Sequence, residues 1–408
     1  MKCLILTLVV TVLVIGDMPI CSAEPRETRT NEYFVSPDGN DSSNGSAARP
    51  WRSIRHAANA VFPGDTVHVL PGTYAEAVTI SQSGTATNRI VFISDTKWGA
   101  LIRGSSVCQG FKTTGRYIDI IGFDISVGSF SCSQTQGIIL SSHDRALGNR
   151  IHDLPCPCNS NGGSGIATNA VDYTTTDSEA SGNVIDNIKG PTNCAEVHGQ
   201  GIYLSTPNGK AFNNIISNTG RSCLDSWHAA TNLVISGNTV MNCGRAGVSI
   251  GAGDAPGGVT NTGSIVTDNI VRNSATGLDE NGLVSGTQFI KNLLYANTTD
   301  FSLVNGTATG TVSADPLHFN YTGSAITGDY HLRPGSPAIG AGTREGAPAE
   351  DFDGAVRPNH LRLDIGVYES SSTLVLWSHR IQERDFNVVH ESTCKICRRA
   401  RHVHQHQH

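Results

Sequence analysis

Two arginines are the residues of this sequence whose spacing most clearly indicates chemistry. Arg221 and Arg245 each lie three residues after an Asn-x-apolar-x-Asn pattern and two residues before the next apolar run. Both anchors place them at equal positions of consecutive repeat units, about one strand spacing (~4.8 Å) apart. Two cations this close repel each other unless an anion or a carboxylate lies between them. One interpretation is that they bind the carboxylate of an acidic sugar, with one arginine as a base. The other is that they pair with Asp225 or another surface acid.

The same alignment places further side chains beside the arginines. One outward-facing row contains Tyr203, Asp225, Ser249 and Asp279, and a row two residues further along contains Ser205, Trp227, Gly251 and Asn281. Small neighbours would leave the face of Trp227 open in a shallow groove, where the apolar face of a sugar could stack on it. In the alternative interpretation, Trp227 packs beneath the 252–263 loop. His228 follows directly and could reach either a ligand or Asp225.

Two long insertions precede this position in the chain. Residues 153–165 and 187–201 separate the two repeat patterns by much more than the five residues that suffice in the following units. These insertions carry Cys156, Cys158, Cys194, Glu196 and His198. A disulfide from Cys194 to either of the other two cysteines would fix them as a wall beside Arg221. Loops held by a rigid scaffold are where functional residues concentrate.

The elements that must position these residues are short repeated strands. The Asn-x-apolar-x-Asn/Asp pattern begins at Asn149, Asn183, Asn214, Asn238 and Asn269, with a weaker copy at Asn292, at separations of 34, 31, 24, 31 and 23 residues. A Gly-apolar pattern such as Gly201-Ile202 follows each copy. A period near 23 residues with β-branched runs fits a solenoid coil of three strands, stacked as parallel sheets. The asparagines are then interpreted as a buried ladder in which each amide bonds the next coil.

The ends of the chain differ from this body. Residues 1–23 read as a signal peptide, with Lys2, an apolar run that is too short to span a membrane and a small-residue site at 21–23. Residues 51–61 are predicted to form a helix that caps the open solenoid end. Residues 373–408 hold a lone Cys-x-x-Cys, an arginine run and alternating histidines, and without a second ligand pair they are predicted to be a disordered tail.

Composition limits the function classes. The chain has 408 residues, 16% of them charged, and a net charge of −6. Because the tail is basic, the body is more acidic than the whole chain, which argues against a nucleic-acid partner. No stretch beyond the leader is long and apolar enough to span a membrane.

Several motifs resemble those of secreted parallel β-helix proteins of the pectate-lyase-like superfamily. The first group is 33–39 (Tyr-Phe-Val-Ser-Pro-Asp-Gly), 63–67 (Pro-Gly-Asp-Thr-Val), 71–74 (Pro-Gly-Thr-Tyr) and 83–85 (Ser-Gly-Thr). The second is 315–317 (Asp-Pro-Leu), 332–338 (Leu-Arg-Pro-Gly-Ser-Pro-Ala) and 364–369 (Asp-Ile-Gly-Val-Tyr-Glu). The resemblance covers residues 31–369 and implies an all-β, right-handed parallel β-helix with a short N-terminal capping helix. It implies no single activity, because the superfamily contains lyases, hydrolases, epimerases and non-catalytic proteins.

The resemblance also implies a cofactor to consider. In pectate-lyase-like enzymes a Ca²⁺ held by carboxylates bridges the substrate uronate and acidifies its α-proton, which a Lys or Arg removes. The candidate oxygen ligands here are Glu196, Asp225, Asp254 and Asp279. The dense Asp cluster of those lyases has no counterpart, and the acid motifs of polygalacturonase-type hydrolases are missing, although residues 198–201 (His-Gly-Gln-Gly) are present.

Together these observations predict a secreted or extracellular polysaccharide-active protein, expected to be a monomer. The leading hypothesis is a lyase that cleaves a uronate-containing polysaccharide by β-elimination, and Ca²⁺ is its candidate cofactor. Catalytic candidates are Arg221, Arg245, Asp225, His198 and His228, and sugar-binding candidates are Trp227, Tyr203 and Glu196. The alternatives are a non-catalytic glycan-binding or cell-surface protein and a glycoside hydrolase.

Overall fold

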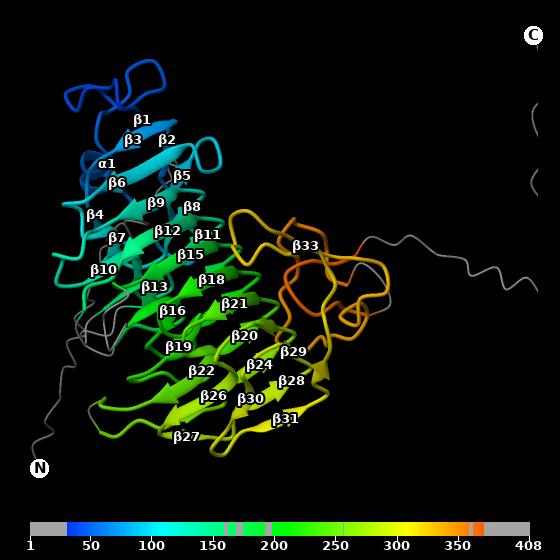
Figure 1. Ribbon diagram of the computed structural model, residues 1–408. Coiled ribbons are helices and arrows are strands. Elements are labelled where there is room, and N and C mark those ends of the chain that lie inside the picture. The colour runs from blue at the N-terminus through cyan, green and yellow to red at the C-terminus, as the bar shows by residue number, and fades with distance from the viewer. Residues whose placement is uncertain are drawn as a thin grey trace, which may run out of the picture. The chain divides into compact units, whose positions relative to one another are not determined.

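Three long parallel sheets form the protein (Figure 1). The computed structural model describes residues 31–158, 162–168, 174–191, 198–255, 257–358 and 362–370, all within one compact unit, Met1–Ser371. The eleven-stranded sheet of this part of the chain consists of β1 (Glu32–Val35), β2 (Thr66–Val69), β5 (Ile90–Ser94), β8 (Ile118–Ile121), β11 (Arg145–Leu147), β14 (Glu179–Ser181), β17 (Lys210–Phe212), β20 (Val234–Ser236), β24 (Ile265–Thr267), β28 (Gln288–Ile290) and β31 (Thr307–Thr309). The ten-stranded sheet consists of β3 (Gly72–Tyr74), β6 (Ala100–Gly104), β9 (Asp124–Val127), β12 (Arg150–Pro155), β15 (Val184–Lys189), β18 (Ile215–Thr219), β21 (Thr239–Cys243), β25 (Ile270–Arg272), β29 (Leu293–Tyr295) and β32 (Val312–Ser313).

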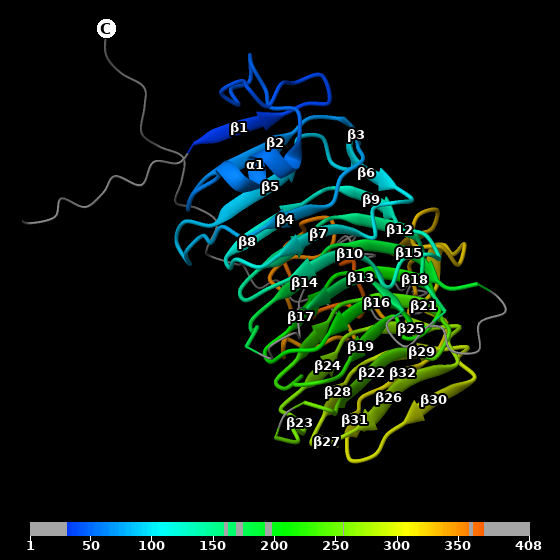
Figure 2. The same cartoon turned by 90° about the vertical axis from the view of Figure 1, so that its left-hand side faces the viewer.

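The third sheet has nine strands and carries the candidate site. It consists of β4 (Val78–Ile80), β7 (Gln109–Thr113), β10 (Thr135–Leu140), β13 (Gly163–Thr168), β16 (Gly199–Leu204), β19 (Leu224–Ser226), β22 (Ala246–Ala252), β26 (Thr276–Gly282) and β30 (Thr299–Ser302). Successive strands of one coil belong to different sheets, so the chain winds around a common core (Figure 2). This is the parallel β-helix expected from the repeat. Two small pairs complete the described strands: β23 (Asn261–Thr262) with β27 (Val284–Ser285), and β33 (His318–Asn320) with β34 (Asp329–Leu332).

The core follows the predicted register. On the inner face of the nine-stranded sheet, Ile138, Ile166, Ile202, Leu224, Val248 and Leu278 pair in order and are almost completely buried. Because side chains alternate between the faces of a strand, the residue that follows each member of this inner row, for example Tyr203 or Asp225, faces outward.

The asparagine ladder is confirmed. Asn149, Asn183, Asn214, Asn238, Asn269 and Asn292 are fully buried, and the Nδ2 of each of the first five donates to the Oδ1 of the next at 2.8–3.1 Å. The residue that ends each full pattern, for example Asn218 or Asn242, has a φ of 54–59°. Asn and Asp tolerate this left-handed conformation better than other non-glycine residues. The first Asn of the pattern therefore belongs to the buried ladder, and the last Asn or Asp forms a turn.

The N-terminal helix is shorter than predicted. The predicted helix spans residues 51–61, whereas α1 spans Ile54–Ala60. The prediction was wrong at Trp51 because this residue forms a β-bridge with Val35, and Ser53 is the N-cap, accepting from the His56 N–H. The apolar side of α1 packs against β1 and β4 at the first coil, as expected for a cap (Figure 2).

The segment after the last coil folds back along the ten-stranded sheet. Asn242 on this sheet donates through Nδ2 to the Gly323 carbonyl oxygen, and Asn213 donates to that of Glu350. The buried Arg357 pairs with Glu369 at 2.8 Å. The segment that follows the last coil therefore covers one side of the solenoid.

Two disulfides, Cys108–Cys132 and Cys223–Cys243, lie within the described residues. Cys158 is also disulfide-bonded, whereas Cys156 is a buried thiol, so only one of the two candidate partners for Cys194 is oxidised. Cys194, the predicted leader and the predicted tail lie outside the described residues. Within that part of the chain, the helix present is too short to cross a bilayer.

Candidate functional site

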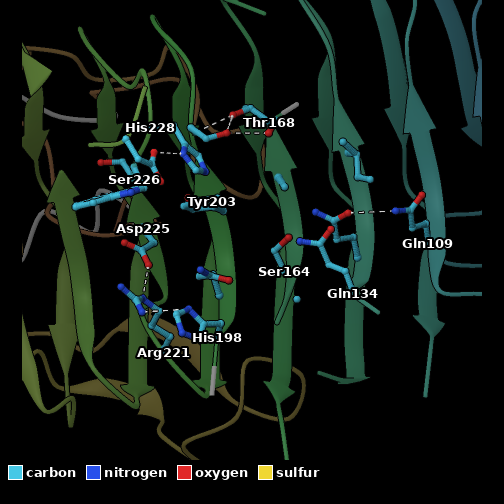
Figure 3. Close-up of a pocket in the computed structure, with 18 of the residues that line it drawn as sticks. Gln109, Gln134, Ser164, Thr168, His198, Tyr203, Arg221, Asp225, Ser226 and His228 are labelled. Atoms are coloured by element: carbon cyan, nitrogen blue, oxygen red, sulfur yellow. Dashed lines mark hydrogen bonds and ion pairs between the residues drawn. The ribbon is translucent and has the colours of Figure 1, made fainter. Parts of the chain in front are cut away.

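A cleft of about 580 Å³ lies on the outer face of the nine-stranded sheet (Figure 3). Strands β7, β10, β13, β16, β19 and β26, with their adjoining turns, supply its lining. The lining residues are Gln109, Lys112, Gln134, Gln136, Ile139, Gly163, Ser164, Ala167, Thr168, His198, Gln200, Tyr203, Ser205, Arg221, Asp225, Ser226, Trp227, His228, Asp254 and Asn281. Seven of the predicted site residues are therefore brought into one cleft: His198, Tyr203, Arg221, Asp225, Trp227, His228 and Asp254.

The two arginines occupy the predicted row but differ in their acidic partners and in their access to the cleft. The Arg245 N–H donates to the Arg221 carbonyl oxygen at 2.9 Å, so they lie on adjacent coils. Arg221 Nε lies 3.1 Å from Asp225 Oδ2, whereas Arg245 Nη2 lies 2.8 Å from Asp279 Oδ2. Each arginine thus has its own acid, and Arg245 is not among the residues that line the cleft.

The buried carboxylate of Asp225 orients the side chain of Arg221. Its carboxylate is 4% exposed, and burial raises its pKa, an effect opposed by the charges of Arg221 and Arg245. Arg221 Nη1 also lies 3.2 Å from His198 Nδ1. A guanidinium group can only donate, so His198 Nδ1 is the acceptor and the neutral ring carries its proton on Nε2. The guanidinium of Arg221 is therefore oriented by partners on two coils.

His228 is held by Asp254 and not by Asp225. Its Nδ1 lies 2.6 Å from Asp254 Oδ1, and its ring meets the Tyr203 ring edge-on with centroids 5.9 Å apart. The backbone φ of His228 is 59°, a left-handed conformation directly after β19. A carboxylate that accepts from Nδ1–H selects the tautomer with its lone pair on Nε2, the arrangement of a histidine base.

Trp227 combines features of both sequence interpretations. The ring is half-buried and lines the cleft. The indole also lies close to two glycines, because a Cβ added at Gly253 or Gly282 would be 2.5 Å from it. Trp227 thus packs against residues at the start of the 252–263 loop and still borders the cleft.

The proposed metal ligands do not come together. Asp225, Asp254 and Asp279 are paired with Arg221, His228 and Arg245, respectively. Among the described residues, no group of three or more His, Cys, Asp or Glu side chains could hold a metal ion. Glu196, the fourth candidate, lies outside the described residues. The described donor set therefore does not fit a calcium site.

A polar row in the cleft was missed by the sequence analysis. Gln109, Gln136, Ser164 and Gln200 are paired in register on four successive strands, β7 to β16. The last three are more than 90% buried. The signal was present, because each of these three residues directly precedes the glycine of a Gly-apolar pattern. Lys112, three residues after Gln109, was also not singled out.

The fold and this outer cleft define a right-handed parallel β-helix protein of the carbohydrate-active kind. Residues 33–314 match the family model described as Pel9A-like, right-handed beta helix region, and the chain belongs to this family. The resemblance to the pectate-lyase-like superfamily is thereby confirmed.

Individual relatives agree with this assignment. Pectate lyase L of Dickeya dadantii (strain 3937) is 23% identical over 307 residues, 68% of this chain and 68% of that protein. The uncharacterized protein YwoF of Bacillus subtilis (strain 168) is 33% identical over 89 residues, 20% of this chain and only 19% of that protein. The crystal structure of pectate lyase Pel9A matches with a TM-score of 0.55 and 18% identity, covering 83% of this chain and 96% of that chain. XylC in complex with xylose has a TM-score of 0.51 and 13% identity, covering 68% and 70% of the two chains. At these identities the two structures show the shared fold.

Proposed function

We propose that this protein is an exported lyase that cleaves a uronate-containing polysaccharide by β-elimination, with Arg221 as the carboxylate clamp and His228 as the base. The observation that carries the proposal is the convergence of two oriented pairs, Arg221–Asp225 and His228–Asp254, in one cleft. Tyr203 connects them, because it pairs in register with Asp225 and its ring contacts that of His228 (Figure 3). Export is supported by the disulfides of the body, which persist in oxidising compartments.

The reaction needs three groups. The clamp offsets the negative charge of the uronate carboxylate, which makes the neighbouring C5 proton more acidic. The base then takes this proton on His228 Nε2, and the electron pair of the C5–H bond forms the C4=C5 double bond. The C4–O bond breaks, and the leaving oxygen takes a proton from the Tyr203 hydroxyl or from water. Asp254 stabilises the imidazolium that forms, as an orienting carboxylate does in a catalytic triad.

The two arginines are less suited to the role of base that the sequence analysis considered. An arginine stays protonated in proteins, and Arg221 is bonded to a buried carboxylate that favours its charged form. Arg245 does not line the cleft. These positions support a clamp role for Arg221 and a supporting role for Arg245.

The names of two relatives support the proposed class of enzyme, a polysaccharide lyase. Pectate lyase L and Pel9A are both named as pectate lyases, enzymes that act on a uronate polymer. The present chain shares their family, but its cleft is built on histidine, tyrosine and arginine.

The test is a screen of uronate polymers read at the absorbance of the unsaturated product. We expect product from at least one polymer and a loss of at least about a hundredfold in kcat for His228→Ala. His143→Ala is a matched control, because His143 also has a positive φ and pairs with an aspartate, Asp177, but lies outside the cleft. New reducing ends without unsaturated product would identify a hydrolase, and polymer binding without cleavage would identify a glycan-binding protein; either result would refute the proposal.

A further inference from the structure

Charged side chains are unevenly distributed along the cleft. At one end, β16, β19 and the turn after β22 supply His198, Arg221, Asp225, His228 and Asp254. At the other end, β7 supplies Lys112. The lining residues from β10 and β13 and their adjoining turns, among those that the structure describes, carry no charge: Gln134, Gln136, Ile139, Gly163, Ser164, Ala167 and Thr168. The cleft therefore has two cationic positions separated by a neutral section.

The distance between the two cationic positions exceeds a single sugar. Lys112 and Asp225, the acid that holds Arg221, belong to one outward row with Ile139, Ala167 and Tyr203 between them. At about 4.8 Å between neighbouring strands, four steps correspond to roughly 19 Å along the sheet stack. A polysaccharide that follows the cleft from Arg221 to Lys112 thus lays intermediate sugar units over β10 and β13.

The neutral section is poorly suited to a carboxylate. Gln136 and Ser164 are 7% and 2% exposed, and no described lining residue of their strands is a cation. A carboxylate placed there would lose water without gaining an ion pair, which is unfavourable. Amides and hydroxyls instead match the hydroxyls of a neutral sugar, and Ile139 and Ala167 offer apolar surface to its C–H face.

We propose that the substrate is a heteropolysaccharide in which uronate residues are separated by neutral sugars, with one uronate at Arg221, a second acidic group at Lys112 and neutral sugars over Gln136 and Ser164. This inference rests on the proposed function only in taking Arg221 as a uronate site. It distinguishes the protein from an enzyme for a homopolymer of uronates, which would place carboxylates over Gln136 and Ser164.

The experiment compares two kinds of polymer by affinity electrophoresis and by product absorbance. The probes are polygalacturonate and alginate as homopolymers, and a polymer of alternating galacturonate and rhamnose as the heteropolymer. We expect the native protein to bind the heteropolymer at least about tenfold more tightly, because a homopolymer would leave a desolvated carboxylate without a partner in the neutral section. Gln136→Lys places a cation in the neutral section and should reverse or abolish this preference, whereas Gln136→Met, of similar size and neutral, should not create homopolymer binding.

The outcomes separate the two proposals. Preferred binding of either homopolymer by the native protein, or an unchanged preference in Gln136→Lys, would refute the inference and leave a lyase assignment intact. Tight heteropolymer binding without unsaturated product would refute the proposed function and support the inference. If neither kind of polymer binds, both proposals are wrong.

Discussion

The two neighbouring arginines offer a matched comparison, because they share their row, their type of partner and their exposure but differ in access to the cleft. Both lie in one row on adjacent coils, and both pair with a nearly buried aspartate. Their side chains are similarly exposed, 26% for Arg221 and 34% for Arg245. Only Arg221 lines the cleft. We therefore predict that Arg221→Ala and Arg245→Ala lower stability to a similar extent and that only Arg221→Ala weakens capture of a uronate polymer.

The magnitudes follow from these contacts. Each substitution leaves one buried carboxylate without its cation, and because both arginines are partly solvated we expect a loss of about 1–2 kcal/mol, less than for a fully buried pair. A charge-assisted hydrogen bond to a bound carboxylate contributes about 1.5–3 kcal/mol, so Arg221→Ala should weaken polymer binding by roughly 10- to 150-fold. Arg245→Ala should change it by less than about threefold, within the range of a rim charge.

The assay is affinity electrophoresis in gels containing the galacturonate–rhamnose polymer, with melting temperatures of all variants as the control for folding. Arg221→Lys keeps the charge but loses the fork that meets both Asp225 and His198, so an intermediate affinity is expected. Equal effects of Arg221→Ala and Arg245→Ala on binding would show that the pair acts through structure or overall charge, and the clamp assignment would then be wrong.

Four further predictions concern stability, cofactor and chain ends. Asn214→Ala removes four buried hydrogen bonds of the ladder and should lower the free energy of unfolding by about 3–5 kcal/mol in urea titrations; a loss below about 1 kcal/mol would show that the ladder contributes little. Burial raises the pKa of Asp144 and of Asp268 to about 7, above the unfolded value of about 4, so the folded state holds these protons more tightly and each group should lower stability by about 2–4 kcal/mol as pH rises from about 4 to 7. Because burial lowers the pKa of His318 to about 3 and acts in the opposite direction, the measurement compares the native protein with Asp144→Asn and Asp268→Asn, and an identical pH dependence of all three would contradict the prediction. Activity should stay within about twofold in EDTA, because Asp225 and Asp279 each pair with an arginine and Asp254 pairs with His228, which leaves no group of described carboxylates for a metal ion; abolition that added Ca²⁺ restores would refute this. Removal of residues 373–408 should leave the melting temperature unchanged, since the repeat ends well before them, and a large decrease would contradict that expectation.

The parts of the molecule that were predictable are those governed by the repeat. Asn214 and Asn238 were recognisable as rungs because a buried amide must bond its neighbours and because each coil presents the same position again. The row Tyr203–Asp225–Ser249–Asp279 followed from the same periodicity, and the register of the strands agrees with it. A strand has a side-chain period of two, so an inner residue such as Leu224 fixes its neighbour Asp225 as outward. The period breaks at the glycine before each inner residue, because Gln136 lines the cleft although it lies two residues before the inner Ile138.

The partners of these outward residues were not predictable. His228 was expected to face a ligand or Asp225, but it pairs with Asp254 in the turn after β22, and both residues have a positive φ. Arg245 likewise pairs with Asp279 on the following coil, whereas Arg221 pairs within its own coil. Such choices depend on turn conformation and rotamers, for which periodicity gives no signal.

Two regular features of the solenoid, the asparagine ladder and the inner apolar row, place the site. The ladder and the inner apolar row hold β16, β19 and β22 at fixed spacing, so groups from three coils meet without any one loop having to position them all. Arg221 is fixed within its coil by Asp225, while His228 is fixed across a coil by Asp254. A one-residue slip of β19 would turn Asp225 inward and separate both pairs at once. The buried Cys223–Cys243 disulfide joins the segments that lead into β19 and β22 and so opposes this slip. The repeat thus fixes the spacing of the strands that form the cleft. The chemistry of the cleft depends on the few outward residues and turns that the repeat does not constrain.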